Sequence, residues 1–154
     1  MERITIETSR REEMADITGD VRRIIKERGW HDGVLTVFCP HTTCGITVNE
    51  GYDPDVAWDM TGFFRGLVPS SRAFRHAEGN SDAHIKASIL GASVQLLVEG
   101  GSLLLGTWQA VWLFLRLPGR LPTRPDRPRN RLKNRHRPPT ITRCGPSVTV
   151  RPLS

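Results

Sequence analysis

The amino-acid sequence changes character near residue 115. Residues 1–114 carry 11 basic and 15 acidic side chains, whereas residues 115–154 carry 11 basic side chains and one acidic side chain. Eight of the 11 prolines also lie in this second segment, at intervals that interrupt both helices and central strands. We therefore expect one folded domain over residues 1–114, followed by a Pro/Arg-rich tail over residues 115–154 that is mostly unfolded.

Hydrophobic periodicity within residues 1–114 predicts a mixture of strands and helices. Alternating or β-rich runs predict strands over residues 3–8, 33–39 and 45–48, and a hairpin of two long strands, 93–98 and 103–114, around Gly100-Gly101. Helical spacing predicts helices over residues 14–28, 54–67 and 82–90. Because these elements lack a regular βαβ repeat, the predicted class is α+β.

Several classes of protein are disfavoured by the sequence. No apolar run reaches the roughly 20 residues that a membrane span needs. The first residues alternate polar and apolar side chains, which is not typical of a secretory signal, so we expect a cytoplasmic protein. Cys39, Cys44 and Cys144 have no C-x-x-C spacing, so neither a disulfide framework nor a zinc ribbon is indicated. We interpret Cys44 as a small buried residue, with a nucleophile beside His41 as the alternative.

Three histidines, His41, His76 and His84, lie in or beside predicted polar loops. Imidazole is both a common metal ligand and a common acid/base group, so histidines at the ends of strands and helices are candidates for a functional site. The alternative is that each histidine only forms local hydrogen bonds. Other polar candidates lie near these histidines in the sequence: Thr42, Thr43, Asn49, Glu50, Asn80 and Lys86.

A second candidate is the segment Gly106-Thr107-Trp108-Gln109, which interrupts an otherwise apolar run. A hydroxyl, an indole and an amide in mid-strand suit contact with a ligand. A glycine bulge whose Trp108 packs in the core would give the same pattern.

Four sequence blocks resemble the secondary thiamine-phosphate synthase family, also called the YjbQ-like proteins. They are PHTTCGITVNE over 40–50, DPDV over 53–56, HAEGNSDAHIK over 76–86, and the segment from Ser93 to the GTWQ of 106–109. The resemblance implies a compact α+β fold with a mixed or antiparallel β-sandwich-like core and flanking helices, assembled as a homotrimer. It also implies a polar pocket in which a pyrimidine pyrophosphate is joined to a thiazole phosphate, with release of pyrophosphate.

The resemblance also assigns roles to residues. His41, His76, His84, Glu50 and Lys86 are the expected catalytic residues, and the three histidines are also the expected ligands of a divalent metal ion. Thr42, Thr43, Asn49, Asn80, Thr107, Trp108 and Gln109 are the expected substrate-binding residues. A small phosphorylated molecule is the expected partner. A metal- or ligand-binding module without turnover is the alternative function.

The resemblance ends after Phe114, where family members continue with an acidic residue, a turn and a last strand. The abrupt change in charge suggests a shift of reading frame near codon 115, which resequencing of the gene would test. Loss of the last strand would leave an unpaired sheet edge. The basic tail also raises the possibility of nucleic-acid binding, but it contains no aromatic residue for base stacking, and a frame shift explains the same composition.

Overall fold

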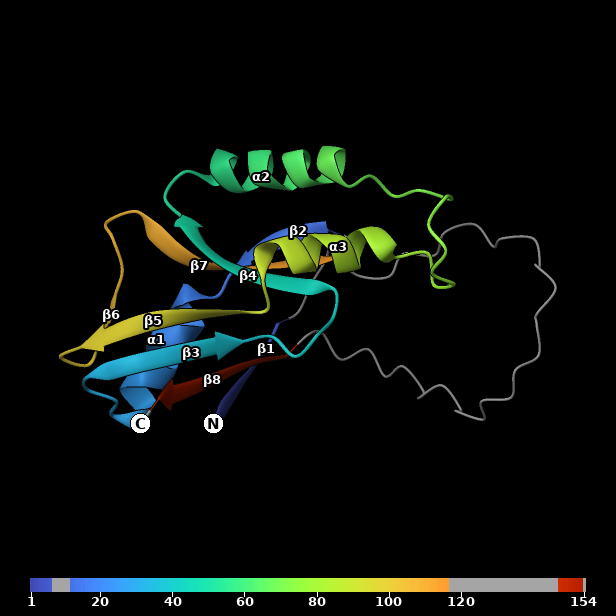
Figure 1. The fold of residues 1–154 in the computed structure, drawn as a ribbon. Helices are drawn as coiled ribbons and strands as arrows, with labels where there is room; N and C mark the ends of the chain where they lie inside the picture. The colour runs from blue at the N-terminus through green and yellow to red at the C-terminus, as the bar shows by residue number, and fades with distance from the viewer. Residues whose placement is uncertain (7–11, 117–146, 154) are drawn as a thin grey trace, which may run out of the picture.

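The computed structural model describes residues 1–6, 12–116 and 147–153, which form two antiparallel sheets and three helices (Figure 1). The first sheet has the strand order β1-β8-β3-β5-β6, and the second has the order β2-β7-β4. This architecture confirms the predicted α+β class. The elements are β1 (Glu2–Thr5), β2 (Glu12–Asp16), α1 (Thr18–Arg28), β3 (Gly33–Phe38), β4 (Cys44–Glu50), α2 (Pro54–Leu67), α3 (Ser81–Leu90), β5 (Ser93–Glu99), β6 (Ser102–Leu104), β7 (Gln109–Arg116) and β8 (Ser147–Leu153).

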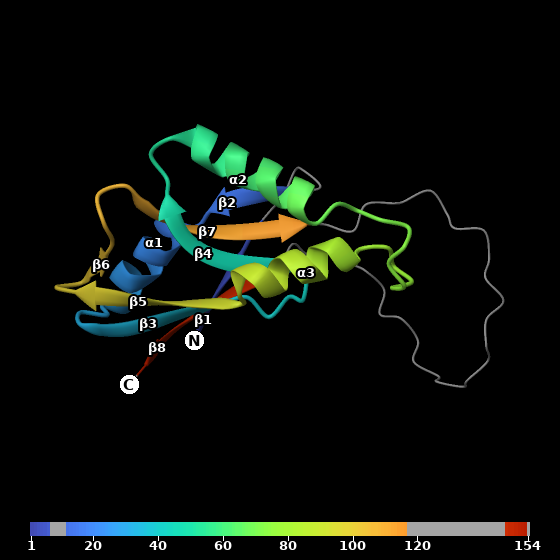
Figure 2. The same cartoon turned by 45° about the horizontal axis from the view of Figure 1, so that its top comes forward.

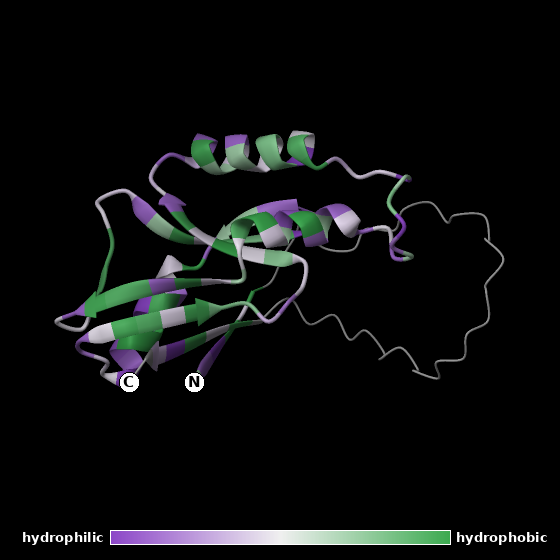
Figure 3. Cartoon of the chain, in the orientation of Figure 1, coloured by the Kyte–Doolittle hydropathy of each residue, from purple (hydrophilic) through white to green (hydrophobic). Residues whose placement is uncertain are grey.

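Both sheets and α1 share one hydrophobic core. Leu35 and Val37 from the first sheet, Leu113 from the second, and Val21 from α1 belong to the same cluster of buried side chains. Burial alternates along parts of β3 and β5, as expected for strands with one buried face, whereas β7 is mostly hydrophobic (Figure 3) and is buried at every position from Ala110 to Arg116. The arrangement is therefore a sandwich closed on one side by a helix.

The predicted helix over 14–28 begins later than expected. Residues 12–16 form β2, which pairs with β7, and α1 starts at Thr18. The carboxylate of Asp16 accepts a hydrogen bond from the backbone N–H of Thr18 at 2.8 Å, which helps to satisfy the start of the helix. Met14 and Ile17 fit a helical spacing, but Met14 lies on the strand.

Helices α2 and α3 follow their predicted positions closely. The side chain of Asp53 caps α2 by accepting from the backbone N–H of Asp55 at 2.9 Å, and Pro54 occupies the first helical position. α3 packs against β4, whereas α2 lies above β2, toward the outside of the molecule (Figure 2).

The expected hairpin of two long strands is broken in its second half. β6 ends at Leu104, and β7 begins at Gln109 in the other sheet. The Gly100-Gly101 turn has positive φ at both glycines, as expected. The chain therefore crosses from the first sheet to the second through residues 105–108. The apolar run 103–114 supplies one strand to each sheet, so its hydrophobic pattern does not show the break.

The C-terminal segment differs from the sequence expectation. Residues 147–153, which lie beyond the expected boundary at 114, form β8 between β1 and β3. Val148 and Val150 are fully buried in the core. Pro152 is tolerated because it lies beyond the end of β1, where β8 has a neighbouring strand on one side only. The expected unpaired edge is therefore covered, and β7 also extends to Arg116. The remainder of the tail, 117–146, lies outside the described residues.

Candidate functional site

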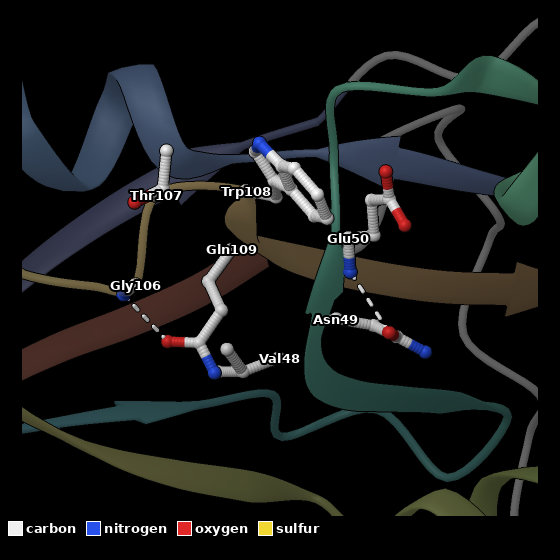
Figure 4. A pocket seen from close by; sticks show the side chains of 7 residues that line it. All are labelled: Val48, Asn49, Glu50, Gly106, Thr107, Trp108 and Gln109. Atoms are coloured by element: carbon white, nitrogen blue, oxygen red, sulfur yellow. Dashed lines mark hydrogen bonds between the residues drawn. The ribbon is translucent and has the colours of Figure 1, made fainter.

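One candidate site is a pocket between the end of β4 and the turn before β7. Its volume is about 590 Å³. Five of the predicted site residues line it together with Val48 and Gly106: Asn49, Glu50, Thr107, Trp108 and Gln109 (Figure 4). Trp108 is 63% exposed, so its indole does not belong to the core. The geometry therefore favours the ligand-contact interpretation of this segment over the core-bulge interpretation.

The wall of this pocket is held by hydrogen bonds within the turn. The backbone N–H of Gln109 donates to the carbonyl of Gly106 at 2.9 Å, and the side-chain Oε1 of Gln109 accepts from the N–H of Gly106 at 2.8 Å. The N–H of Gly51 donates to the carbonyl of Trp108 at 2.7 Å, which ties the turn to the end of β4. A Cβ at Gly51 would lie 2.4 Å from the Cβ of Ala110, so only glycine allows this close approach.

A second candidate site contains two of the predicted histidines. The imidazole rings of His76 and His84 are 5.1 Å apart between centroids and lie edge to face. His84 lies in the first turn of α3, and Nε2 of His76 is 3.8 Å from the carboxylate of Glu78. Asn80 is buried, and its Oδ1 has no hydrogen-bond partner among the described residues. This end of α3 therefore presents imidazole groups and one unsatisfied amide oxygen.

His41 forms its contacts within its own loop. Its Nδ1 is 3.0 Å from the hydroxyl of Thr43 and accepts from the backbone N–H of Thr43 at 3.3 Å. Thr43 is buried, whereas His41 and Thr42 are exposed. The loop between β3 and β4 and the N-terminal end of α3 lie on the same side of the molecule (Figures 1 and 2).

A metal ion was expected at His41, His76 and His84. Within the described ranges, no group of three or more His, Cys, Asp or Glu side chains is placed to hold a metal ion. Protein metal sites generally need three or four such ligands. One chain, as described, thus supplies a pair of imidazoles and no complete metal site, and we derive no chemical step through a metal.

Lys86 is buried, being only 1% exposed, and is held in a cluster of charges. Its ammonium group pairs with Glu12, and lies 3.8 Å from Asp82 one helical turn away. Arg116 donates to Asp82 at 2.7 Å, and Arg65 from α2 contacts Glu12 at 3.2 Å. The cluster therefore joins β2, α2, α3 and β7, and the ammonium group of Lys86 contacts protein carboxylates within it.

Sequence reasoning missed most of this cluster. Asp82 and Lys86 are four residues apart on a predicted helix, which is the spacing of an ion pair, so this contact could have been predicted from the sequence. Glu12 lies 74 positions from Lys86 in the chain, and nothing in the sequence links them.

Cys39 and Cys44 bracket the His41 loop, and both thiols are buried. A hydrogen bond from the Cys44 thiol lowers the pKa of Cys39 to about 7. The same hydrogen bond, with burial, raises the pKa of Cys44. Cys39 therefore loses its proton near neutral pH, whereas Cys44 keeps its proton and donates it to the Cys39 sulfur. The interpretation of Cys44 as a buried residue is confirmed.

The two candidate sites lie at opposite ends of β4. His41 and its neighbours precede the strand, and Glu50 ends it, so about 20 Å separates them at ordinary strand rise. Figures 1 and 2 show the segment between β6 and β7 on the side opposite to the start of α3. The predicted residues therefore form two groups within one chain.

Two further expectations concern nucleic-acid binding and membrane spanning. Most of the basic side chains proposed for nucleic-acid contact lie in 117–146, outside those residues. In the part of the chain that the structure describes, no helix has both the length and the apolar character that crossing a bilayer requires.

A family model, described as UPF0047 protein YjbQ-like, matches residues 2–116. The chain belongs to the YjbQ-like UPF0047 family. It is 46% identical to the UPF0047 protein MJ1081 of Methanocaldococcus jannaschii over 107 residues, which cover 70% of this chain and 78% of that protein. It is also 46% identical to the UPF0047 protein YugU of Bacillus subtilis over 110 residues, covering 71% of this chain and 83% of YugU.

Several solved structures share this fold. A family member from Clostridium acetobutylicum, described as an orthologue of YugU, superposes with a TM-score of 0.79 at 34% identity, covering 99% of this chain and all of that one. The conserved hypothetical protein TT1486 of Thermus thermophilus gives a TM-score of 0.76 at 35% identity, with 99% and 100% coverage. These likenesses agree with the α+β sandwich described above.

Proposed function

We propose that this YjbQ-like protein is a transferase of the secondary thiamine-phosphate synthase type, acting in the cytoplasm. The observation that carries the proposal is the pocket formed by Glu50 and the turn at 106–109. Its volume of about 590 Å³ is in the range of small-molecule sites and leaves space for a heteroaromatic ring. An exposed indole next to the carboxylate of Glu50 is suited to holding such a ring.

The proposed reaction is a substitution at the methylene carbon of a pyrimidine pyrophosphate. The nitrogen lone pair of a thiazole phosphate forms the new C–N bond, and the C–O bond breaks with its electron pair leaving on pyrophosphate. The protein must hold the two rings in line and stabilise the leaving charge. The imidazole groups of His76 and His84, together with the positive end of the α3 dipole, would meet that charge.

The separation between the two groups sets a condition on this mechanism. Because about 20 Å lies between the ends of β4, one small substrate cannot contact both groups in a single chain. We propose that the site is composite, with the ring pocket of one copy facing the histidine end of another in a homotrimer. Lys86 would then have a positioning role, since its ammonium group is occupied by Glu12 and Asp82.

Pyrophosphate release tests the proposal. Purified protein is supplied with the aminopyrimidine pyrophosphate and the thiazole phosphate, and released pyrophosphate is measured. We expect His84→Ala to lower the rate by about a hundredfold, the usual loss for an acid/base or charge-stabilising group. His31→Ala is the matched control, because the side chain of His31 is exposed and pairs with Asp32, away from both candidate sites. Absence of release by the unaltered protein, or equal rates for His84→Ala, would overturn the proposal.

A binding module without turnover is the second candidate. It is favoured by the separation of the pocket from the histidines and by the burial of Lys86. It predicts ligand binding without pyrophosphate release. The divalent ion stays a prediction, and elemental analysis of the purified full-length protein tests it directly.

A further inference from the structure

The pocket beside Trp108 has an unusual balance of charge for a protein that handles phosphate esters. Of the described residues that line it, Glu50 carries a carboxylate, and none is Lys, Arg or His. A phosphate group placed here would face the Glu50 carboxylate without a compensating cation from the described lining residues of the same chain. The lining therefore disfavours anions and suits a ligand that is positively charged or rich in hydrogen-bond donors.

The hydrogen bonds already made in the pocket leave one strong acceptor free. Oε1 of Gln109 is used by the N–H of Gly106, and Oδ1 of Asn49 accepts from the backbone N–H of Glu50 at 2.8 Å. Nδ2 of Asn49 is directed to the sulfur of Met60 at 3.0 Å. The carboxylate of Glu50 makes no side-chain hydrogen bond or ion pair with another described residue, so it is the group left to receive a ligand.

The indole of Trp108 supplies the second half of a recognition site. It is 63% exposed, and its position on the turn is fixed by the backbone hydrogen bonds described above. An aromatic face attracts planar rings by stacking, and it attracts cations through the ring quadrupole. Figure 4 shows the indole of Trp108 and the side chain of Glu50 on either side of the end of β4, with Gln109 and Val48 lying together farther along the pocket wall.

We infer that the Trp108 pocket selects a planar heteroaromatic cation, stacked on the indole with its positive charge balanced by Glu50. The inference rests on the proposed function for the source of the ring, which would be the cationic thiazolium of the product. The phosphate end of that ligand would have to lie outside this pocket. The charge preference itself depends only on the lining residues, so it can hold or fail independently of catalysis.

Three probes with one ring and different charges test the inference. The positively charged 1-methylnicotinamide, the neutral nicotinamide and the negatively charged nicotinate are titrated into the full-length protein by calorimetry near neutral pH. We expect 1-methylnicotinamide to bind about fivefold more tightly than nicotinamide, as expected for one partly solvated charge pair, with nicotinate weakest.

Variants separate the contributions of charge and stacking. Glu50→Gln is expected to reduce the preference for the cation to within about twofold while keeping ring binding. Trp108→Leu is expected to abolish binding of all three probes, whereas Trp108→Phe retains the order. Asp59→Asn is the control for a lost surface carboxylate, because Asp59 is exposed on α2 outside the pocket.

The outcomes separate this inference from the proposed function. Equal affinities, tighter binding of nicotinate, or no binding of any probe at about 10 mM would overturn the inference, whatever the pyrophosphate assay shows. An order unchanged by Glu50→Gln would also overturn it. Charge-ordered binding without pyrophosphate release would overturn the transferase and leave the inference intact.

Discussion

Lys86 has an environment that an ammonium group rarely occupies. It is 1% exposed, and removing such a charge from water costs several kcal/mol unless carboxylates compensate it. Glu12 and Asp82 provide that compensation, and Arg116 balances the second carboxylate. These four buried charges sum to zero, and Arg65, the fifth member of the cluster, is largely exposed, so the buried set is sensitive to the loss of any member.

Replacing Lys86 should therefore be costly for folding. We expect Lys86→Met to lower the free energy of unfolding by about 3 kcal/mol, since it leaves buried carboxylates without their cation. Urea denaturation followed by circular dichroism measures the change. Lys26→Met, on the exposed face of α1, should change the same quantity by about 0.5 kcal/mol or less. Comparable effects for the two variants would contradict the burial of the cluster.

The thiol pair around the His41 loop gives a prediction in pH. Because the hydrogen bond from Cys44 lowers the pKa of Cys39 to about 7, thiolate absorbance should rise near neutral pH. Removing the donor with Cys44→Ala should raise the pKa of Cys39, so the midpoint moves to higher pH. The titration is done in a Cys144→Ser background, so that only these two thiols contribute. A midpoint that Cys44→Ala leaves in place would disprove the coupling.

At the level of elements, the sequence predicted helices better than strand ends. α2 and α3 lie within a residue or two of prediction because proline, capping and glycine signals mark their ends. The run 103–114 was read as one strand because its apolar residues continue through a change of sheet. β8 was missed because its two buried valines form a short alternation within a proline-rich segment.

The position of β8 can be tested through its two faces. Val150 is fully buried between β1 and β3, so Val150→Ala should lower the free energy of unfolding by about 2 kcal/mol, from lost burial and the remaining cavity. Thr149 is only partly buried, and Thr149→Ala should cost about 1 kcal/mol or less. Thermal and urea denaturation give both values. An effect at Thr149 equal to that at Val150 would contradict the register.

The division of the candidate site was also implicit in the sequence. His41 and Glu50 belong to one motif block, but a strand was predicted between them, and an extended strand cannot bring its own ends together. The hydrogen bond from Gly51 to Trp108, which holds the turn beside the end of β4, could not be read from the sequence, since it depends on the close approach of Gly51 to Ala110.

At the scale of the whole molecule, several large hydrophobic side chains are exposed on the helices. α2 buries Phe64 but leaves Trp58, Phe63 and Leu67 exposed, and Ile89 on α3 is exposed as well. Hydrophobic residues are spread along the length of α2 in Figure 3. These side chains are the surface that we expect other copies of the chain to cover.

Light scattering after size-exclusion chromatography tests the expected homotrimer. The measured mass should be three times the chain mass of 17.3 kDa. Charged residues on the exposed face of α2, introduced as Trp58→Glu with Phe63→Glu, should shift the mass to that of one chain. Arg22→Glu, on α1, is the control and should leave the assembly intact. A single-chain mass for the unaltered protein would refute the expectation.

The place of β8 between β1 and β3 has a consequence for how the protein is made. β1, β3, β5 and β6 all precede β8 in the chain, so the ribosome has synthesised four strands of the sheet before the strand that joins β1 to the others emerges. Until then the nascent chain keeps one side of β3 open to neighbouring polypeptides. Chaperone occupancy during translation should therefore persist until β8 has left the exit tunnel.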